Sequence, residues 1–385
     1  MAISIYVHFP FCIRKCPYCD FYSVAIQPSL IAQRQYTDAL IDELRWRASD
    51  LFDLPLESVY FGGGTPSLWD PAELGRVLEA IVARFSRDQA DTEVTLECNP
   101  GSITKDRAAA YRRSGVNRLS IGVQSLDDRH LRYLERPHDG QAGLDAIELG
   151  LVELGRVGVD MIYGLAEQTT EAFCGELERL AGLGVKHLSA YSLTIETNTP
   201  FGKRKQKGQL SMGREEDAAE CFLASRKTLE ALGFEHYEVS NYALPGEKSR
   251  HNQHYWRGGD YLGLGASAVG CLHTGMGRAR RYRNTPDIDR YIAYSKRAEV
   301  ESFEEQLGPL EIINESLMLG LRTRSGVHLP TVQARSGLTL LERRDRDFHD
   351  LLQKGLLVKK GDWLKIPAEN WLYLDSIVAN AFMTR

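Results

Sequence analysis

The first half of the chain alternates short stretches of β-forming residues with longer stretches of helical periodicity, and this alternation limits the folds open to it. Six predicted strands span residues 4–9, 58–61, 93–97, 118–122, 159–163 and 187–191. The helical stretches between them include residues 36–47, 71–85, 142–154 and 171–183. This spacing predicts an α/β fold with a parallel sheet. We expect a partial (β/α)6 barrel, and the pattern leaves a doubly wound open sheet as the alternative.

The periodicity changes after residue 195, which predicts a different organisation for the rest of the chain. We expect the basic run at residues 203–207 to be a solvated loop, and a helix over residues 215–232 to end at Gly233. A helix around residues 340–354, a hairpin over residues 357–366 and a final helix after Glu369 predict a winged-helix-like unit in an α+β C-terminal region. We therefore expect a barrel at residues 1–200, a region at 201–305 packed on it, and a C-terminal domain at 306–385.

Three of the seven cysteines, Cys12, Cys16 and Cys19, follow the first predicted strand at short spacing. Such spacing indicates metal or redox chemistry. A single zinc ion takes four ligands, so a zinc site would need distant His254 or Asp20 as well. A [4Fe–4S] cluster held by three cysteines instead leaves one iron open to another ligand. We favour the cluster over zinc and over three unrelated thiols.

Composition narrows the class of protein. The hydrophobic content of 43% is ordinary for a globular chain of 385 residues. No window approaches the ~18 consecutive apolar residues of a membrane span, and the first residues do not resemble a signal peptide. A net charge of −5 argues against bulk electrostatic binding to nucleic acid. Mostly scattered cysteines do not indicate a disulfide framework, so we expect a reducing, cytoplasmic location.

The Cys-x3-Cys-x2-Cys spacing, with Tyr18 directly before the third cysteine, resembles the radical S-adenosylmethionine (SAM) superfamily. The resemblance implies that Cys12, Cys16 and Cys19 hold a [4Fe–4S] cluster whose open iron binds the amino and carboxylate groups of SAM. In that superfamily an electron from the cluster cleaves SAM to a 5′-deoxyadenosyl radical. The cofactors carry this chemistry, and the protein supplies binding and orientation.

Further motifs follow in the order that the superfamily shows. A glycine-rich run at residues 62–66 follows a strand, where glycines let backbone amides approach a ligand closely. The resemblance implies that this run, with residues further along, binds SAM through Tyr6, Gly63, Gly64, Thr65, Glu97, Gln124, Arg136 and Asp160. Each side chain also has a structural alternative, such as a helix cap for Glu97 or Asp160 and a surface ion pair for Arg136. Their order behind the cysteine loop favours the SAM site.

Within the superfamily, residues 4–200 resemble the oxygen-independent coproporphyrinogen III oxidases. Those oxidases have a fourth cysteine where this chain has Phe21, and a long extension ahead of the cysteine loop where this chain has eleven residues. The sequence more closely resembles the HemW family of oxidase-like haem chaperones. That resemblance implies haem binding and transfer to apo-haemoproteins. Oxidative decarboxylation of porphyrinogen propionates is the alternative, and enzymatic cleavage of SAM is left open.

The His-Asn-x-x-Tyr-Trp motif at residues 251–256 carries this resemblance, and it implies haem binding by His251, Asn252, Tyr255 and Trp256. Imidazole is a common ligand of haem iron, and aromatic rings can pack on the macrocycle. We prefer His251 to His254, which occupies a variable position; a structural histidine between core aromatics is the alternative. Nearby arginines could pair with the propionates, and these are Arg250, Arg257, Arg278, Arg280, Arg281 and Arg283.

The resemblance also implies partners. Haem would be the cargo, and the acceptors would include respiratory enzymes at the cytoplasmic face of the membrane. Peripheral membrane association and a homodimer are left open. We expect no nucleic-acid partner, because the C-terminal unit mixes acidic residues freely with its basic ones.

Overall fold

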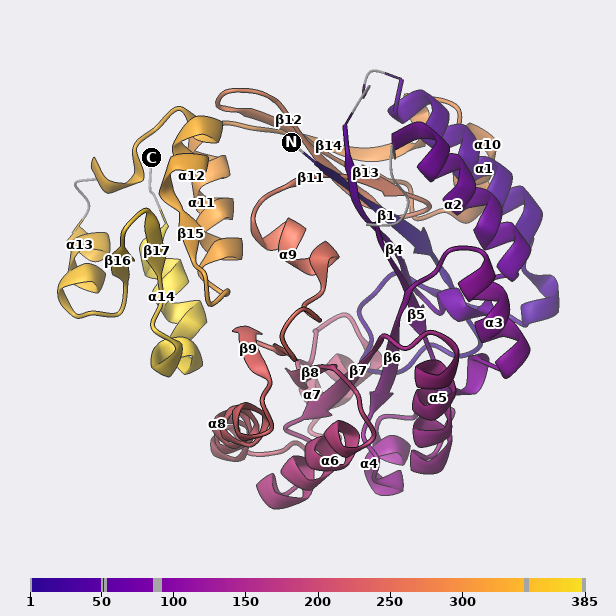
Figure 1. The fold of residues 1–385 in the computed structure, drawn as a ribbon, viewed down its shortest axis with the longest axis horizontal. Coiled ribbons are helices and arrows are strands. Elements are labelled where there is room, and N and C mark those ends of the chain that lie inside the picture. The colour runs from indigo at the N-terminus through magenta and orange to yellow at the C-terminus, as the bar shows by residue number, and fades with distance from the viewer. Residues whose placement is uncertain (1, 50, 52–53, 86–91, 343–345, 383–385) are drawn as a thin grey trace.

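The computed structural model describes residues 2–49, 51, 54–85, 92–342 and 346–382, and its largest sheet over these residues has twelve strands. Six parallel strands are neighbours in the order in which they occur along the chain. Because each strand is added on the same side of the one before it, the connecting helices lie along the outer face of the curved sheet (Figure 1). The partial barrel is therefore confirmed, and the doubly wound sheet is excluded. The six strands are β1 (Ile3–Phe9), β4 (Leu56–Gly63), β5 (Glu93–Cys98), β6 (Arg118–Gln124), β7 (Val157–Tyr163) and β8 (His187–Ser192).

The helices that cover this sheet each present one apolar stripe to it. In α2 (Pro71–Phe85), Leu74, Val77, Leu78 and Ile81 are buried at intervals of one to three residues, so they share one face of the helix. This helix has the bounds predicted from the sequence. The other helices of the barrel region are α1 (Gln33–Arg47), α3 (Lys105–Arg113), α4 (Asp128–Tyr133), α5 (Gly140–Glu153), α6 (Thr170–Gly182) and α8 (Glu215–Ala231).

The barrel strands have two chemically different faces. In β1, Ile5 and Val7 belong to the apolar core beneath the helices, whereas Tyr6 and His8 line a cavity on the inner side. Each of the other five strands alternates in the same way. Parallel strands that are packed on both faces are normally apolar throughout. The polar inner face therefore shows that the barrel encloses a lined cavity rather than a second packed core.

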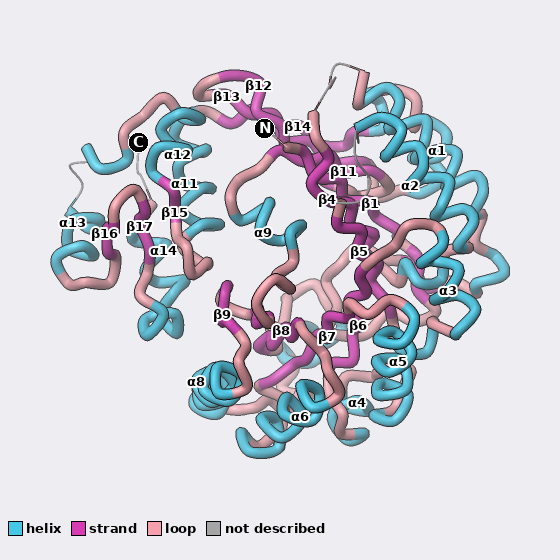
Figure 2. Tube along the Cα trace, in the orientation of Figure 1, coloured by secondary structure: helices cyan, strands magenta, loops and turns pink. Residues whose placement is uncertain are grey.

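Later strands extend both edges of the parallel sheet (Figure 2). On one edge, β11 pairs parallel with β1 and is followed by antiparallel β12, β13 and β14. On the other edge, β10 pairs antiparallel with both β8 and β9. The chain between residues 233 and 307 thus completes the barrel wall. Its elements are β9 (Glu235–Glu238), β10 (Asn241–Ala243), α9 (Arg250–Trp256), β11 (Asp260–Leu264), β12 (Val269–Gly275), β13 (Arg278–Asn284), α10 (Ile288–Tyr294) and β14 (Glu301–Leu307).

Residues 203–206 of the basic run predicted to be a loop lie instead within α7 (Pro200–Gln206), and Lys207 follows as its C-cap. The side chain of Thr199 accepts a hydrogen bond from the amide of Gly202 at 3.0 Å, and Pro200 occupies the first turn. Both features begin helices. Phe201 is buried beside the ring of Tyr133, at 5.4 Å between centroids, and this contact anchors the helix while its basic side chains stay exposed.

The C-terminal region forms the predicted α+β unit. A three-stranded sheet, which includes the expected hairpin, packs with several helices (Figure 1). The helix predicted around residues 340–354 is present only as α13, and residues 343–345 lie outside the described part of the chain. No helix in the described residues is long and apolar enough to cross a membrane. The elements are α11 (Pro309–Gly320), β15 (Val327–His328), α12 (Leu329–Ser336), α13 (Arg346–Gln353), β16 (Val358–Lys360), β17 (Trp363–Lys365) and α14 (Leu374–Ala381).

A buried ion pair joins the first barrel helix to the added strands. Nε of Arg47 lies 2.5 Å from Oε1 of Glu43 on the same helix, and both side chains are almost fully buried. The guanidinium also bonds Glu301 in β14 and Asn284 in β13, each at 2.7 Å. The second oxygen of Glu43 accepts from the hydroxyl of Tyr291 at 2.6 Å. Residues more than 230 positions apart are thus held in one polar network.

Candidate functional site

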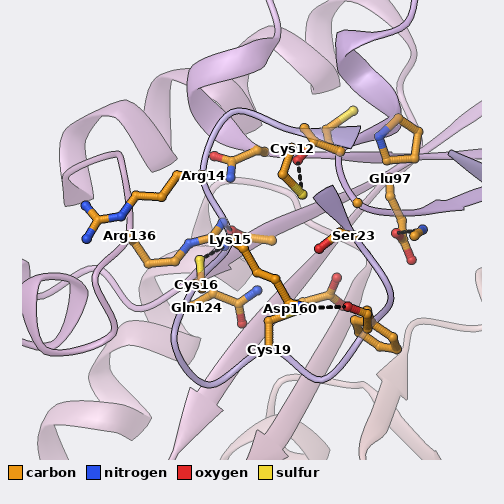
Figure 3. A pocket seen from close by; sticks show the side chains of 18 of the residues that line it. Cys12, Arg14, Lys15, Cys16, Cys19, Ser23, Glu97, Gln124, Arg136 and Asp160 are labelled. Carbon is orange, nitrogen blue, oxygen red and sulfur yellow. Dashed lines mark hydrogen bonds between the residues drawn. The ribbon is translucent and has the colours of Figure 1, made fainter. Parts of the chain in front are cut away.

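The loop that carries the three cysteines leaves the carboxyl end of β1 and enters a pocket of about 170 Å³. A short parallel pair, β2 (Phe11–Cys12) and β3 (Val24–Ala25), closes the base of this loop. Cys12, Cys16 and Cys19 all line the pocket, as Figure 3 shows. The pocket therefore lies where barrels of this type place their active sites.

The pocket surrounds the thiols with hydrogen-bond donors. The hydroxyl of Thr65 donates to Sγ of Cys12, and Nη1 of Arg136 donates to Sγ of Cys16, each at 3.5 Å. Burial raises the pKa of the Cys12 and Cys19 thiols above the ordinary value. A bound metal centre would lower these pKa values again, since metal ligands bind as thiolates.

The described residues contain no group of three or more Cys, His, Asp or Glu side chains placed to hold a single metal ion. A [4Fe–4S] cluster sets a different requirement, because each of three irons takes one thiolate. Three cysteines in one pocket, with donors to two of them, fit that requirement.

The glycine-rich turn after β4 places a backbone amide against Glu97. Gly63 has a φ of +115°, and a Cβ atom there would lie 2.5 Å from the ring of His8. Only glycine fits this position without strain. Its amide donates to one oxygen of Glu97 at 3.0 Å, and the hydroxyl of Tyr60 donates to the other at 2.8 Å. Burial nevertheless raises the pKa of Glu97 to about 7.

Replacing Glu97 by glutamine is expected to change how stability depends on pH. The carboxyl has an ordinary pKa of 4.5, and folding raises it to about 7. Such a group stabilises the folded state fully below the lower pKa, and this contribution is lost as the pH rises through about 7. Between about pH 5 and about pH 8, the wild type should therefore lose roughly 3 kcal/mol more stability than Glu97→Gln. Urea denaturation of the cofactor-free proteins measures this difference, and parallel curves would contradict it.

Three further pocket residues are held in defined positions. Gln124 has a φ of +72° and follows an irregularity in the pairing of β6 with β7. Nη2 of Arg136 donates to the carbonyl of Gly122 at 2.7 Å, and the hydroxyl of Ser120 donates to Asp160 at 3.0 Å. Positive φ in a residue other than glycine costs about 1–3 kcal/mol, and such residues cluster at ligand sites. The conformation of Gln124 therefore supports the assignment of this end of β6 to the site.

Three buried polar atoms of residues that line the pocket have no hydrogen-bond partner among the described residues. They are Oγ of Ser23, Oδ1 of Asn99 and Nε of Arg136. Buried polar groups are normally paired, and each unpaired group calls for an explanation. A donor, an acceptor and a hydroxyl that can act as either suit a polar zwitterionic ligand. A second cavity of about 350 Å³ shares Glu97, Gln124 and Asp160 with this pocket and gives such a ligand room.

The structure brings together the residues predicted to bind SAM, with one difference. Gly63, Gly64, Thr65, Glu97, Gln124, Arg136 and Asp160 all line the cysteine pocket. Tyr6 lies instead in a neighbouring cavity, which shares Glu97 and Phe21 with that pocket. Its position earlier in β1 places it deeper in the barrel, where its hydroxyl contacts Nδ1 of His8 at 2.9 Å.

The neighbouring cavity, which we call the His251 cavity, has a volume of about 520 Å³, within the range of small-molecule sites. Ser249 caps α9 by accepting from the amide of Asn252, which fixes the helix that carries His251. Nδ1 of His251 lies 2.8 Å from the hydroxyl of Ser58, and the ring stacks on Tyr60. Its Nε2 is buried and has no partner among the described residues. Burial lowers the pKa of His251 to about 3, so the imidazole is neutral.

The residues of the His-Asn-x-x-Tyr-Trp motif do not all line the same cavity. His251, Asn252 and Tyr255 line the His251 cavity, but Trp256 does not. Adjacent residues point about 100° apart around a helix, and Trp256 therefore packs beside Tyr237, at 5.9 Å between ring centroids. The prediction that Trp256 shares the site with His251 is not supported by this placement.

His254 has a structural environment. Its Nε2 contacts the carbonyl of Asp260 at 2.7 Å, and its Nδ1 lies 3.6 Å from Glu57. Both ring nitrogens of His254 therefore have polar partners, whereas Nε2 of His251 has none among the described residues.

Several residues of the His251 cavity were not identified from the sequence. They lie on β1, β4, β8, β11 and the loops near them, so no local motif joins them. The alternation of polar with apolar residues along the barrel strands was the available signal. These residues are His8, Tyr22, Tyr60, Tyr191, Tyr261 and Ser267.

Comparison with known proteins agrees with the architecture. Residues 6–180 match the radical SAM superfamily, and residues 307–373 match the HemN C-terminal domain. The Escherichia coli protein named heme chaperone HemW is 38% identical over 74% of this chain and 74% of its own length. The Haemophilus influenzae protein of the same name is 31% identical over 98% and 97%. The chain belongs to the HemW family of radical SAM proteins.

Other comparisons extend this result. The mouse protein named radical S-adenosyl methionine domain-containing protein 1, mitochondrial, is 38% identical over 97% of this chain and 86% of its own length. The solved structure of coproporphyrinogen III oxidase (HemN) from Escherichia coli shares the fold, with a TM-score of 0.80 at 22% identity over 99% of this chain and 90% of that one. Membership of the radical SAM superfamily implies a [4Fe–4S] cluster and SAM as cofactors.

Proposed function

We propose that this protein holds haem in the His251 cavity and passes it to apo-haemoproteins. One observation carries the proposal: His251 lines a cavity of about 520 Å³, and its buried Nε2 has no partner among the described residues. The names of the bacterial relatives, heme chaperone HemW, support the same function. They favour it over the oxidative decarboxylation of porphyrinogens that the sequence left as an alternative.

The chemistry of His251 suits a ligand of haem iron. Neutral imidazole coordinates iron through one ring nitrogen while the other makes an orienting hydrogen bond. In the tautomer whose Nδ1 carries the proton and donates it to Ser58, the ring presents the Nε2 lone pair for coordination. Aromatic rings form much of the cavity wall and offer flat apolar surfaces to a macrocycle. The tyrosines of this wall are Tyr6, Tyr22, Tyr60, Tyr191, Tyr255 and Tyr261.

The cysteine pocket is the proposed site of the cofactors. Cys12, Cys16 and Cys19 would hold the [4Fe–4S] cluster, and the cluster with SAM supplies one-electron chemistry when bound. Arg136 would offset the negative charge of the thiolates, because it donates to Cys16. The remaining pocket residues would bind and orient SAM, and these are Gly63, Gly64, Thr65, Glu97, Gln124 and Asp160. Phe21 lines both the cysteine pocket and the His251 cavity, so both ligands would lie near its ring.

Haem titration with His251→Ala tests the proposed function. Wild-type protein should bind about one haem per chain, and the variant should bind at least about tenfold more weakly because an iron ligand is lost. Soret absorbance measures both binding and ligation, and apomyoglobin serves as a generic acceptor for transfer. His254→Gln is the matched control, since His254 is satisfied by other contacts, and it should retain haem binding. A wild type without saturable haem binding would contradict the proposal.

We extend the proposal to the acceptor proteins, the roles of the domains and the oligomeric state. We infer that the acceptors include respiratory enzymes reached at the cytoplasmic membrane face. We also propose that residues 1–200 form the cofactor-binding part of the barrel, that residues 201–305 supply the haem motif and complete the barrel wall, and that residues 306–385 contact the partners. Co-sedimentation of haem-loaded protein with membranes rich in respiratory enzymes tests the first point. Light scattering with and without haem tests a homodimer.

A further inference from the structure

Strand β13 carries four arginines, and ion pairs within the fold determine which of them is available to bind a ligand. Arg280 pairs with Glu301 and with Glu304 on the adjacent strand β14. Arg281 pairs with Glu305 on β14 and with Glu315 on α11. These guanidinium groups are already matched by carboxylates within the fold, and neither residue lines the cavity.

Arg283, two residues further along the same strand, has a different environment. Its side chain lines the His251 cavity, and among the described residues no carboxylate lies within ion-pair distance of it. Its Nη2 and Nε donate to the hydroxyl of Ser267 at 2.8 and 3.3 Å. Nη1 has no hydrogen-bond partner in the described part of the chain. A guanidinium with an unused donor at the edge of a cavity is suited to bind a carboxylate.

Ser267 is held in an unusual backbone conformation that supports this arrangement. Its φ is +65°, in the left-handed region that residues other than glycine rarely adopt. The residue is buried, and its amide donates to the carbonyl of Thr285 at 2.9 Å. Strained residues of this kind concentrate at ligand sites. The hydroxyl of Ser267 fixes the guanidinium of Arg283 at the edge of the cavity.

The wall of the cavity therefore holds two unlike groups. His251 is buried and neutral and contacts Ser58, which pairs with Ser4 early in β1, whereas Arg283 is exposed and cationic and is bonded to Ser267, which follows the carboxyl end of β11. Two carboxyl groups, Asp20 and Glu97, also line the cavity. Glu97 is engaged by Tyr60 and Gly63, and Asp20 makes no ion pair with Arg283. Haem has a matching polarity, since its iron lies in an apolar ring whose propionates extend from one edge.

We propose that Arg283 binds a propionate carboxylate of the haem in the His251 cavity, and that Ser267 is the residue that positions it. This inference rests on the proposed function and deepens it, because it predicts the orientation of the cargo. The macrocycle enters with its propionate edge toward β13 and solvent, so its apolar edge is the one inserted into the barrel.

A comparison of two ligands tests this orientation. Ferric haem and its dimethyl ester, in which both propionates are neutral, are titrated into cluster-loaded full-length protein in the same solvent. Arg283→Gln should weaken binding of free-acid haem about tenfold, which is the loss expected for a charge-assisted hydrogen-bond pair. The same variant should bind the ester as wild type does. Arg278→Gln is the matched control, because it removes the same charge from the same strand and Arg278 does not line the cavity.

Ser267→Ala gives a second readout. In the wild-type background, this substitution should weaken the binding of free-acid haem about threefold. In the Arg283→Gln background it should have no further effect, because Ser267 acts on haem only by positioning Arg283. The Soret maximum should stay unchanged in both variants, because iron ligation is not touched.

The outcomes separate this inference from the proposed function. If wild type binds haem and His251→Ala weakens it, but Arg283→Gln binds free-acid haem normally, the orientation proposed here is wrong while the function stands. Equal weakening of acid and ester in Arg283→Gln would also overturn it, because the effect would not depend on the propionate. Absence of haem binding in wild type would reject the function, and this inference with it.

Discussion

Cys19→Ser is expected to abolish the iron–sulfur absorbance of the anaerobically reconstituted protein. A serine hydroxyl ionises far less readily than a thiol, and this position is half-buried, which already raises the pKa of the native thiol. Bound iron should fall by more than about tenfold, because even residues that only contact metal ligands cost tenfold or more when replaced. Iron and sulfide analysis, together with visible absorbance, measures the loss.

Cys98 provides a sharp control for that experiment. It lines the same pocket, but burial raises the pKa of its thiol to about 12, and it lies on β5 rather than on the cysteine loop. Cys98→Ala should therefore keep a full complement of iron and sulfide. Retention of a complete cluster in Cys19→Ser, or equal loss in both variants, would contradict the assignment of the three loop cysteines.

Arg47→Met is expected to lower the free energy of unfolding by about 3–5 kcal/mol. Methionine replaces the aliphatic part of the arginine side chain but not its charge. Glu43 and Glu301 are therefore left as buried carboxylates without their shared cation. It also removes the contact of the guanidinium with the ring of Tyr282, at 3.6 Å from the centroid. Because this network joins α1 to β13 and β14, the strand that carries Arg283 should loosen as well. Guanidinium denaturation of the cofactor-free protein measures the change.

A pair on the same helix supplies the comparison. Arg45 lies 3.0 Å from Asp42, but its side chain is 73% exposed. Exposed ion pairs contribute only about 0–1 kcal/mol, so Arg45→Met should have little effect. The double variant Arg47→Met/Glu43→Gln should recover part of the stability, since one uncompensated charge is removed. Similar values for Arg45→Met and Arg47→Met would show that the buried network is not a main source of stability.

Features set by short-range spacing could be predicted from the sequence. The strand–helix alternation predicted the six parallel strands in order, and the apolar stripe of α2 gave its bounds correctly. Cys12, Cys16 and Cys19 came together in one pocket because they share one loop at the end of one strand. Gly63 was predictable for a similar reason, since a turn that needs positive φ selects glycine locally.

The basic helix α7 shows where local inspection failed. The charge of residues 203–207 suggested a loop, but the decisive features precede that run in the sequence. A capping threonine, a proline in the first turn and a buried phenylalanine begin the helix, and its basic face then remains in solvent. Charge alone did not distinguish an exposed helix from a loop.

What the sequence determined by itself was the fold class, the cysteine loop and the order of the residues around it, because each depends on neighbours a few positions apart. Only the tertiary structure decided which arginine is available, since Arg280 and Arg281 find their carboxylate partners on another strand and Arg283 finds none among the described residues. It likewise separated His251 from His254 and Trp256 within one short helix. Those distinctions depend on contacts between different elements of the fold, from Arg280 with Glu301, 21 positions apart, to Ser58 with His251, 193 positions apart, and no short sequence pattern encodes them.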